Sequence, residues 1–155
     1  MDRKDTANGI GGGLLVYSRD GLDILPCDKV LNFDQYVKFT VTNCGITNTI
    51  FLVYRPPSSA DMDGLTNIIK SATNNTLFIG DFNLPGINWE NWTGNGRVVD
   101  FLEAAGDKFL EQLVTFPTHV KGNILDLVLT NAAGNIHSVT DEGRLGKSDH
   151  VMLRI

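Results

Sequence analysis

The chain has 155 residues, 42% of them hydrophobic and 20% charged, with a formal net charge of -5 and a pI near 5.0. This composition predicts one globular domain at residues 9–155, preceded by a flexible end at residues 1–8, and no repeat or low-complexity segment is visible. The acidic balance excludes the overall basic surface of many nucleic-acid-binding domains. An enzyme that contacts phosphates through divalent cations needs acidic residues, so a phosphate ester remains open as a substrate.

The cysteines and the N-terminus bear on where the protein works. Cys27 and Cys44 form no C-x-x-C motif and have no histidine at ligand spacing, so we predict free thiols in a reducing compartment. No apolar run approaches the roughly 20 residues that a bilayer span needs, and the first residues lack a signal-peptide core. The sequence therefore predicts an intracellular protein without membrane association, and no basic nuclear import signal is visible.

The first third of the chain is predicted to be rich in strands. Alternating apolar residues and turn signals predict two antiparallel hairpins, with strands at residues 14–17, 22–25, 35–42 and 48–54. The glycine run at 9–13 lacks the Lys-Ser/Thr of a phosphate-binding loop, so we interpret it as close backbone packing. Pro56 and Pro57 end the strand pairing, and a loop must start there.

The remainder of the chain mixes helices and strands. Amphipathic helices are expected at 61–72, with an aspartate at the start as N-cap, and at 98–105. Further strands are expected at residues 77–79, 113–115, 124–129, 136–139 and 151–155. Trp89 and Trp92, which follow the strand at 77–79, fit either stacking on a nucleic-acid base or anchoring a loop on the core.

The first candidate functional residues are Asp81 and Asn83, which follow the strand at 77–79. In an extended backbone residues two apart project to the same side, so the carboxylate and the amide can converge on one ligand. That pair suits a hard cation or a phosphoryl group. The alternative, that Gly-Asp-Phe-Asn-Leu-Pro-Gly is only a strand end followed by a turn, stays open because all four polar and breaker types are turn residues.

Three more polar residues lie at the edges of apolar strands. Asp126 interrupts an apolar run, and a charge there is costly unless it is paired, while Asp149 and His150 immediately precede the last strand. Each alone fits a structural role: a buried aspartate bound by backbone amides, a turn residue, and a histidine at a strand start. Together with Asp81 and Asn83 they fit a phosphoryl-transfer site at the end of a sheet.

These motifs together resemble the endonuclease/exonuclease/phosphatase superfamily, and within it the endonuclease domain of non-LTR (LINE-like, jockey-like) retrotransposon polyproteins. The segments that carry the resemblance are G-D-F-N at 80–83, the aspartate of I-L-D at 126, S-D-H at 148–150 and Y-R-P-P at 54–57. The Leu-Pro-Gly-Ile-Asn-Trp after G-D-F-N and the block at 123–131 are similar to the retroelement branch, not to relatives that act on inositol phosphates or sphingolipids. The resemblance runs from about residue 11 to the C-terminus.

The resemblance implies an α/β fold, a four-layer αββα sandwich of the DNase I-like type, with two mainly antiparallel sheets and outer helices. It implies Mg²⁺- or Mn²⁺-dependent hydrolysis of DNA phosphodiesters, with DNA as the partner and a reverse transcriptase domain in the full-length polyprotein. Such an enzyme would act in the nucleus. Tyr54 would hydrogen-bond the scissile phosphate.

The resemblance also implies a role for each polar residue. Asp81 would orient or deprotonate the attacking water, and Asn83 would hold that water or a phosphate oxygen. Asp149, together with Asp81, would bind the metal ion. His150 would donate a hydrogen bond to a non-bridging oxygen, and Asp126 would fix the imidazole tautomer and raise its pKa.

One part of the family pattern is missing. Members begin with a strand carrying an asparagine and then a metal-binding glutamate, and neither motif is found here. The glutamates Glu90, Glu103 and Glu111 come too late in the order to replace it. We therefore expect an N-terminally truncated domain, and two alternatives stay open: a non-catalytic remnant, and a phosphoesterase of the same fold that acts on a small phosphate.

Overall fold

The structure is a computed structural model that describes residues 2–4, 13–27 and 35–155 of the chain. In chain order the elements are β1 (Asp2–Lys4), β2 (Leu14–Val16), β3 (Asp23–Pro26), β4 (Tyr36–Asn43), β5 (Ile46–Tyr54), α1 (Met62–Lys70), β6 (Thr76–Asp81), α2 (Val98–Asp107), β7 (Glu111–Gln112), β8 (Asp126–Thr130), η1 (Ala133–Asn135), β9 (Thr140–Arg144) and β10 (Val151–Arg154). Most of the predicted flexible end and of the glycine run lies outside the described residues.

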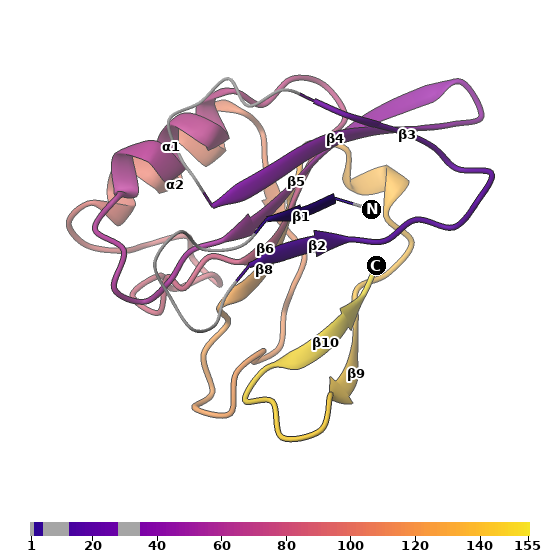
Figure 1. The fold of residues 1–155 in the computed structure, drawn as a ribbon. Coiled ribbons are helices and arrows are strands. Elements are labelled where there is room, and N and C mark those ends of the chain that lie inside the picture. The colour runs from indigo at the N-terminus through magenta and orange to yellow at the C-terminus, as the bar shows by residue number, and fades with distance from the viewer. Residues whose placement is uncertain (1, 5–12, 28–34) are drawn as a thin grey trace.

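Six strands form the central sheet, in the order β3-β4-β5-β6-β8-β7 (Figure 1). Every neighbouring pair is antiparallel except β5 and β6, which are parallel and are connected through α1. Two smaller two-stranded sheets, β1-β2 and β9-β10, accompany it. The predicted α/β fold with mainly antiparallel sheets and outer helices is confirmed.

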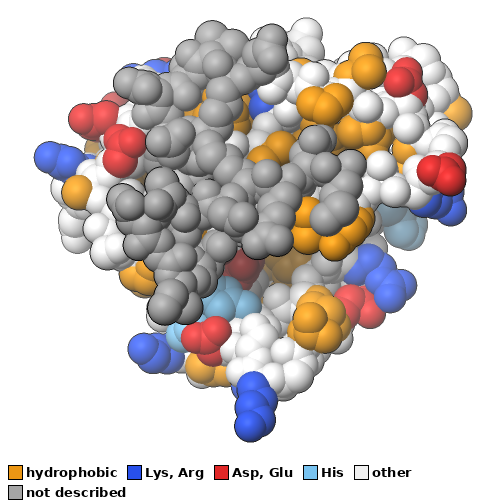
Figure 2. Space-filling view, viewed as in Figure 1, with side chains coloured by type: hydrophobic (Ala, Val, Ile, Leu, Met, Phe, Trp, Pro, Cys, Tyr) orange, Lys and Arg blue, Asp and Glu red, His pale blue; other side chains and the backbone are white. Residues whose placement is uncertain are grey.

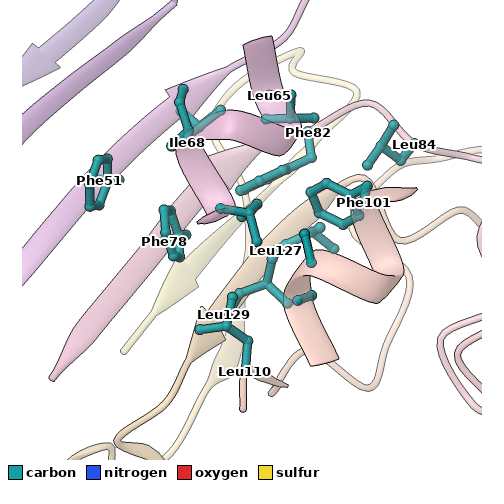
Figure 3. Packing of buried hydrophobic residues seen from close by; sticks show 14 of the residues in the cluster. Phe51, Leu65, Ile68, Phe78, Phe82, Leu84, Phe101, Leu110, Leu127 and Leu129 are labelled. Carbon is teal, nitrogen blue, oxygen red and sulfur yellow. The ribbon is translucent and has the colours of Figure 1, made fainter. Parts of the chain in front are cut away.

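Helices α1 and α2 lie side by side and cover one face of the central sheet (Figure 1). Asp61 caps α1, because its carboxylate accepts a hydrogen bond from the Gly64 N–H at 2.7 Å. Apolar side chains at helical spacing point from α1 to the sheet, and they include Leu65, Ile68 and Ile69. The core between helices and sheet contains Phe51, Phe78, Phe82, Phe101, Leu127 and Leu129 (Figure 3). Each such side chain contributes about 1.5–3 kcal/mol through burial.

The hairpin predicted at residues 14–25 is wrong. β2 pairs with β1, and β3 pairs with the edge of β4, so the two strands belong to different sheets. Local alternation identified both strands but carries no information about which neighbour completes the hydrogen bonds. The hairpin of β4 and β5 is confirmed, and Cys44 and Gly45 turn the chain there with φ values of 50° and 79°.

Two of the short strands are predicted in the wrong place. The strand expected at 113–115 is found two residues earlier, as β7, because the chain turns at Phe109, where φ is 54°, and pairs with β8 immediately afterwards. The strand expected at 136–139 is absent from the described chain, in which η1 ends at Asn135 and pairing begins again only at Thr140. The apolar residues in that segment, Ile136 and Val139, are half-buried without pairing.

Candidate active site

Three polar side chains stand next to one another where β5, β6 and β8 meet. Tyr54 is in register with Asp81 across the parallel pair, and Asp81 is in register with Asp126 across the antiparallel pair. The residues next to them in the chain are buried in the core on the helical side: Val53, Phe82 and Leu127. Because successive strand residues point to opposite faces, Tyr54, Asp81 and Asp126 share the face away from the helices.

The glycine of the G-D-F-N motif allows this close packing. Gly80 has φ of +128°, and a Cβ atom built there would lie 2.0 Å from the carbonyl oxygen of Val53. Any other residue would therefore push β6 away from β5. Gly80 keeps the two strands close enough for Tyr54 and Asp81 to be neighbours.

Asn83 does not follow the extended geometry predicted for it. Its φ is 50°, in the left-handed region, so the chain has already turned two residues after Asp81. The Asn83 N–H donates to Asp81 Oδ1 at 3.0 Å, which is the hydrogen bond of an Asx turn. The turn interpretation is therefore confirmed, and the turn itself orients the Asp81 carboxylate.

Arg55 supports this turn, a role that the sequence did not reveal. Its buried guanidinium donates to the carbonyl oxygens of Asn83 at 3.0 Å and Ser59 at 2.5 Å. Its backbone N–H donates to the Asp81 carbonyl at 2.8 Å. Its positive charge also attracts the carboxylates of Asp81 and Asp61. Arg55 therefore fixes the loop that follows β6 and places a cation behind the site.

His150 is bound to the Asp126 carboxylate. The His150 Nδ1 atom lies 2.7 Å from Asp126 Oδ2, and the two side chains are 26% and 17% exposed. A carboxylate can only accept, so Nδ1 carries the proton and Nε2 is left for a ligand. Burial alone would lower the pKa of His150, but the hydrogen bond and charge of Asp126, with Asp81 and Asp149, raise it above 6.5.

The negative charge of Asp81 is destabilised by its surroundings. Burial and then the nearby Asp126 carboxylate raise the pKa of Asp81 from 3.8 to about 6, although His150, the Asn83 N–H and His119 act in the opposite direction. Two carboxylates in register on neighbouring strands thus share a partly buried space. This is the environment in which a carboxyl group titrates near neutral pH.

A segment that sequence analysis did not single out, Thr118 and His119, connects the strand ends. The buried Thr118 Oγ1 accepts the backbone N–H groups of Leu125 and Asp126, both at 3.0 Å. The His119 ring lies 4.9 Å from that of His150, and His119 Nε2 lies 3.3 Å from Asp149 Oδ2. No sequence signal marks a lone Thr-His pair in a loop, because the contacts of His119 with Asp149 and His150 join segments about 30 residues apart.

The group of imidazoles and carboxylates is visible at the surface. Figure 2 shows pale blue histidine atoms beside red carboxylate atoms at the lower left of the face. The nitrogen and oxygen atoms that His119, Asp149 and His150 could offer to a ligand lie within 4.8 Å of one another. The structure therefore brings together Asp81, Asp126, Asp149 and His150, as predicted, and adds His119.

The oxygen atoms of the site fit a divalent cation. The neighbouring carboxylates of Asp81 and Asp126 repel each other, which a cation would offset, and the Asp149 side chain is 68% exposed. Carboxylate oxygens are the donors that Mg²⁺ and Mn²⁺ prefer. Asp149 belongs to the group of ligand atoms that lie within 4.8 Å of one another, together with His119 and His150, and Asp81 is not a member of that group.

The tryptophan loop lies against the core. The rings of Trp89 and Trp92 meet edge to face with centroids 5.5 Å apart, and both pack on the main hydrophobic cluster. These contacts favour the loop-anchoring interpretation over stacking on a base.

The two cysteines, Cys27 and Cys44, are free. Among the described residues no helix is long and apolar enough to cross a membrane.

The helix-covered sheet, with polar residues gathered at the strand ends, defines a DNase I-like α/β fold. The chain belongs to the endonuclease-reverse transcriptase family, whose model matches residues 48–154. The resemblance to retrotransposon endonucleases in the endonuclease/exonuclease/phosphatase superfamily is confirmed. A search of curated proteins gives no match.

A solved structure shares the fold. The endonuclease domain of TRAS1, a telomere-specific non-LTR retrotransposon, matches with a TM-score of 0.65 and 17% identity over 86% of this chain and 65% of that one. An endonuclease/exonuclease/phosphatase family protein from Leptotrichia buccalis C-1013-b (TM-score 0.46, 14% identity, 90% and 63% covered) and the Haemophilus ducreyi cytolethal distending toxin (0.45, 18%, 87% and 57%) also match. The chain thus spans 65% of the length of the TRAS1 domain.

Proposed function

We propose that this chain is the endonuclease part of a retroelement protein and hydrolyses phosphodiester bonds of DNA with a divalent metal ion, Mg²⁺ or Mn²⁺. The observation that carries the proposal is the alignment of Tyr54, Asp81 and Asp126 on one face of three neighbouring strands, with His150 bound to Asp126 at 2.7 Å. A water-activating carboxylate and an imidazole that donates to a phosphate are the two groups that such hydrolysis needs.

Asp81 and Asn83 act on the attacking water. Asp81 has a pKa of about 6, so near neutral pH it is ionised but remains a useful base, and it orients or deprotonates the water. The Asn83 N–H holds Asp81 Oδ1, which fixes the carboxylate relative to the strand. The Asn83 side chain then holds the water or a phosphate oxygen.

Asp126, His150 and Tyr54 act on the phosphate. Asp126 holds the His150 Nδ1 proton and stabilises the imidazolium, so His150 Nε2–H can donate to a non-bridging oxygen as negative charge develops. Tyr54, in register beside Asp81, hydrogen-bonds the scissile phosphate. A divalent ion held by Asp81 and Asp149 would supply charge neutralisation for the leaving oxygen.

DNA is the proposed substrate, and the nucleus is the proposed place of action. A reverse transcriptase domain is the proposed partner in the full-length polyprotein, since the family description joins endonuclease and reverse transcriptase. A non-catalytic remnant of the domain is the second candidate. It is favoured by one observation: among the described residues, no glutamate joins the group of His119, Asp149 and His150.

Nicking of supercoiled plasmid tests the proposal. We expect the purified chain to nick plasmid with Mg²⁺ or Mn²⁺ and to lose this activity in EDTA and in the variants Asp81→Asn and His150→Ala. His137→Ala, at an exposed histidine, is the matched control and should retain activity.

If circular dichroism shows that the protein is folded and it does not nick plasmid, the proposal fails and the non-catalytic remnant is the remaining candidate. A parallel assay with a small phosphate monoester separates DNA hydrolysis from a phosphoesterase of the same fold. Hydrolysis of the small substrate without plasmid nicking would contradict the proposal.

A further inference from the structure

His119 is largely buried, and its hydrogen-bond partner, the Asp149 carboxylate, is exposed. The His119 side chain is 10% exposed and that of Asp149 is 68% exposed, with Nε2 and Oδ2 3.3 Å apart. The His119 ring also meets the His150 ring at 72°, with centroids 4.9 Å apart. An imidazole fixed by packing therefore contacts a carboxylate that is otherwise free to change rotamer.

The proton of His119 is placed by the backbone. The Lys121 N–H donates to His119 Nδ1 at 3.2 Å, and a backbone N–H can only donate. Nδ1 is therefore an acceptor, so the ring proton is on Nε2, the atom that faces Asp149. His119 thus presents an N–H group to the Asp149 carboxylate.

The backbone of this segment is held at both ends. The Val120 N–H donates to the Asp149 carbonyl, and the Val151 N–H donates to the Thr118 carbonyl, both at 2.9 Å, so His119 and His150 form an antiparallel bridge. The Gly122 N–H closes a turn onto the His119 carbonyl at 2.9 Å. The position of His119 relative to Asp149 is therefore set by main-chain hydrogen bonds on either side of the pair.

We propose that His119 is a positioning residue that holds the Asp149 carboxylate, through Nε2–H, in the orientation in which it binds the metal ion. The inference rests on the proposed metal-dependent function, and it adds a residue to which the family resemblance gave no role. An exposed carboxylate loses rotamer freedom when it binds an ion, and a preformed hydrogen bond removes part of that cost. Removal of a side chain that hydrogen-bonds a metal ligand typically lowers the metal affinity 10- to 100-fold.

The same hydrogen bonds argue against His119 as a metal ligand itself. A ligating nitrogen needs a free lone pair, and a ligating histidine normally donates its other ring N–H to a partner. Here the other nitrogen, Nδ1, is occupied as an acceptor by the Lys121 N–H. The geometry therefore indicates that His119 donates a hydrogen bond to the Asp149 carboxylate and does not bind the metal ion.

The test compares His119→Leu, which removes the donor, with His119→Gln, whose amide N–H can reach the position of Nε2. His137→Leu is the matched control at an exposed histidine. Mn²⁺ alone is the probe, and its binding is followed through the loss of the free-ion electron paramagnetic resonance signal. We expect Mn²⁺ affinity to fall about tenfold in His119→Leu, to recover in His119→Gln, and to be unchanged in His137→Leu.

Asp149→Asn is measured beside these variants to separate the two proposals. If Asp149→Asn weakens Mn²⁺ binding and His119→Leu does not, the positioning role is overturned. If no variant and no wild-type chain binds Mn²⁺, the proposed metal-dependent function fails.

A measurement without metal then decides the role of His119. Nitrogen-15 NMR in EDTA should show the Nε2–H tautomer of His119 in the wild type, and Asp149→Ala should alter the His119 Nε2–H signal. A Nδ1–H tautomer, or a signal that Asp149→Ala leaves unchanged, would overturn the inference whether or not the chain nicks DNA.

Discussion

The site contains two pairs of histidine and aspartate that differ in burial. In the pair of His150 and Asp126 the atoms are 2.7 Å apart and both side chains are largely buried, whereas in the pair of His119 and Asp149 they are 3.3 Å apart and the carboxylate is 68% exposed. Each pair joins distant segments, across 24 and 30 residues respectively. The imidazole rings of His119 and His150 meet edge to face, with centroids 4.9 Å apart.

The difference in burial indicates a difference in function. A buried hydrogen-bonded pair acts in a lower dielectric, where it strongly fixes tautomer and charge, as the raised pKa of His150 shows. An exposed pair contributes little to stability, because water and salt screen it. In the proposed function, the exposed pair is therefore suited to orienting a carboxylate that must remain accessible to a ligand, and the buried pair to setting the protonation of His150.

The largest expected effect comes from breaking the buried pair. We expect Asp126→Asn to reduce the plasmid nicking rate about 10²- to 10³-fold, because His150 loses the partner that fixes its tautomer and stabilises its charged form. Asp107→Asn, at an exposed aspartate at the end of α2, is the control and should nick at the wild-type rate. A nicking rate in Asp126→Asn within threefold of wild type would mean that the pair is only structural.

The next largest effect is expected from Thr118, whose side chain anchors Asp126 and whose backbone binds Val151. Thr118→Val leaves two backbone N–H groups without an acceptor, so we expect a loss of about 2–4 kcal/mol in the free energy of unfolding, measured in urea. Thr118→Ser keeps the hydroxyl and should lose much less. The exposed Thr115→Val is the matched control, and an equal loss there would contradict this reasoning.

The third prediction concerns the negative charge of Asp81, whose pKa the Asp126 carboxylate of the buried pair helps to raise. Its pKa is raised in the folded state, so its proton is bound more tightly there and the wild type loses stability as pH rises from about 4 to above 6. The difference between 3.8 and about 6 is worth at most about 3 kcal/mol. We expect Asp81→Asn, in EDTA, to be more stable than wild type at pH 8 and nearly equal at pH 3.5.

Asp149→Asn provides the contrast for that experiment. Its own backbone N–H, and also the hydrogen bond from His119, keep the pKa of Asp149 below its ordinary value, so removing its charge should give no such gain at pH 8. Stabilisation by Asp149→Asn comparable to that by Asp81→Asn would show that exposure does not distinguish the two carboxylates.

The smallest expected effect is that of salt. Raising NaCl from 0.1 to 1 M shortens the screening length from about 10 to about 3 Å, which weakens exposed pairs far more than buried ones. We expect the pKa of His150, followed by NMR in EDTA, to stay above 6.5 at both salt concentrations, because Asp126 is largely buried beside it. In Asp126→Asn the pKa should fall, since burial then dominates. If the pKa of His150 falls in the wild type at high salt, the pair of His150 and Asp126 is screened by salt as an exposed pair would be.

Local sequence predicted most of the elements and singled out the main candidate site residues. Alternation and apolar runs predicted β4, β5, β6 and β8, and helical spacing predicted α1 and α2, because the pattern of apolar residues follows the burial of each element. Asp81, Asp126, Asp149 and His150 could be singled out because each is a polar residue at the edge of an apolar strand, where burial makes an unpaired charge costly.

Tertiary structure decided what no local pattern contains. Strand partners in the first 26 residues depend on distant edges, so the predicted hairpin was wrong although its strands were right. Arg55, Thr118 and His119 belong to the site only through contacts across 28, 8 and 30 residues. The sequence by itself therefore determined which polar groups are candidates for the proposed chemistry, and only the fold decided which residues hold these groups in place, because positioning is a relation between segments that folding brings together.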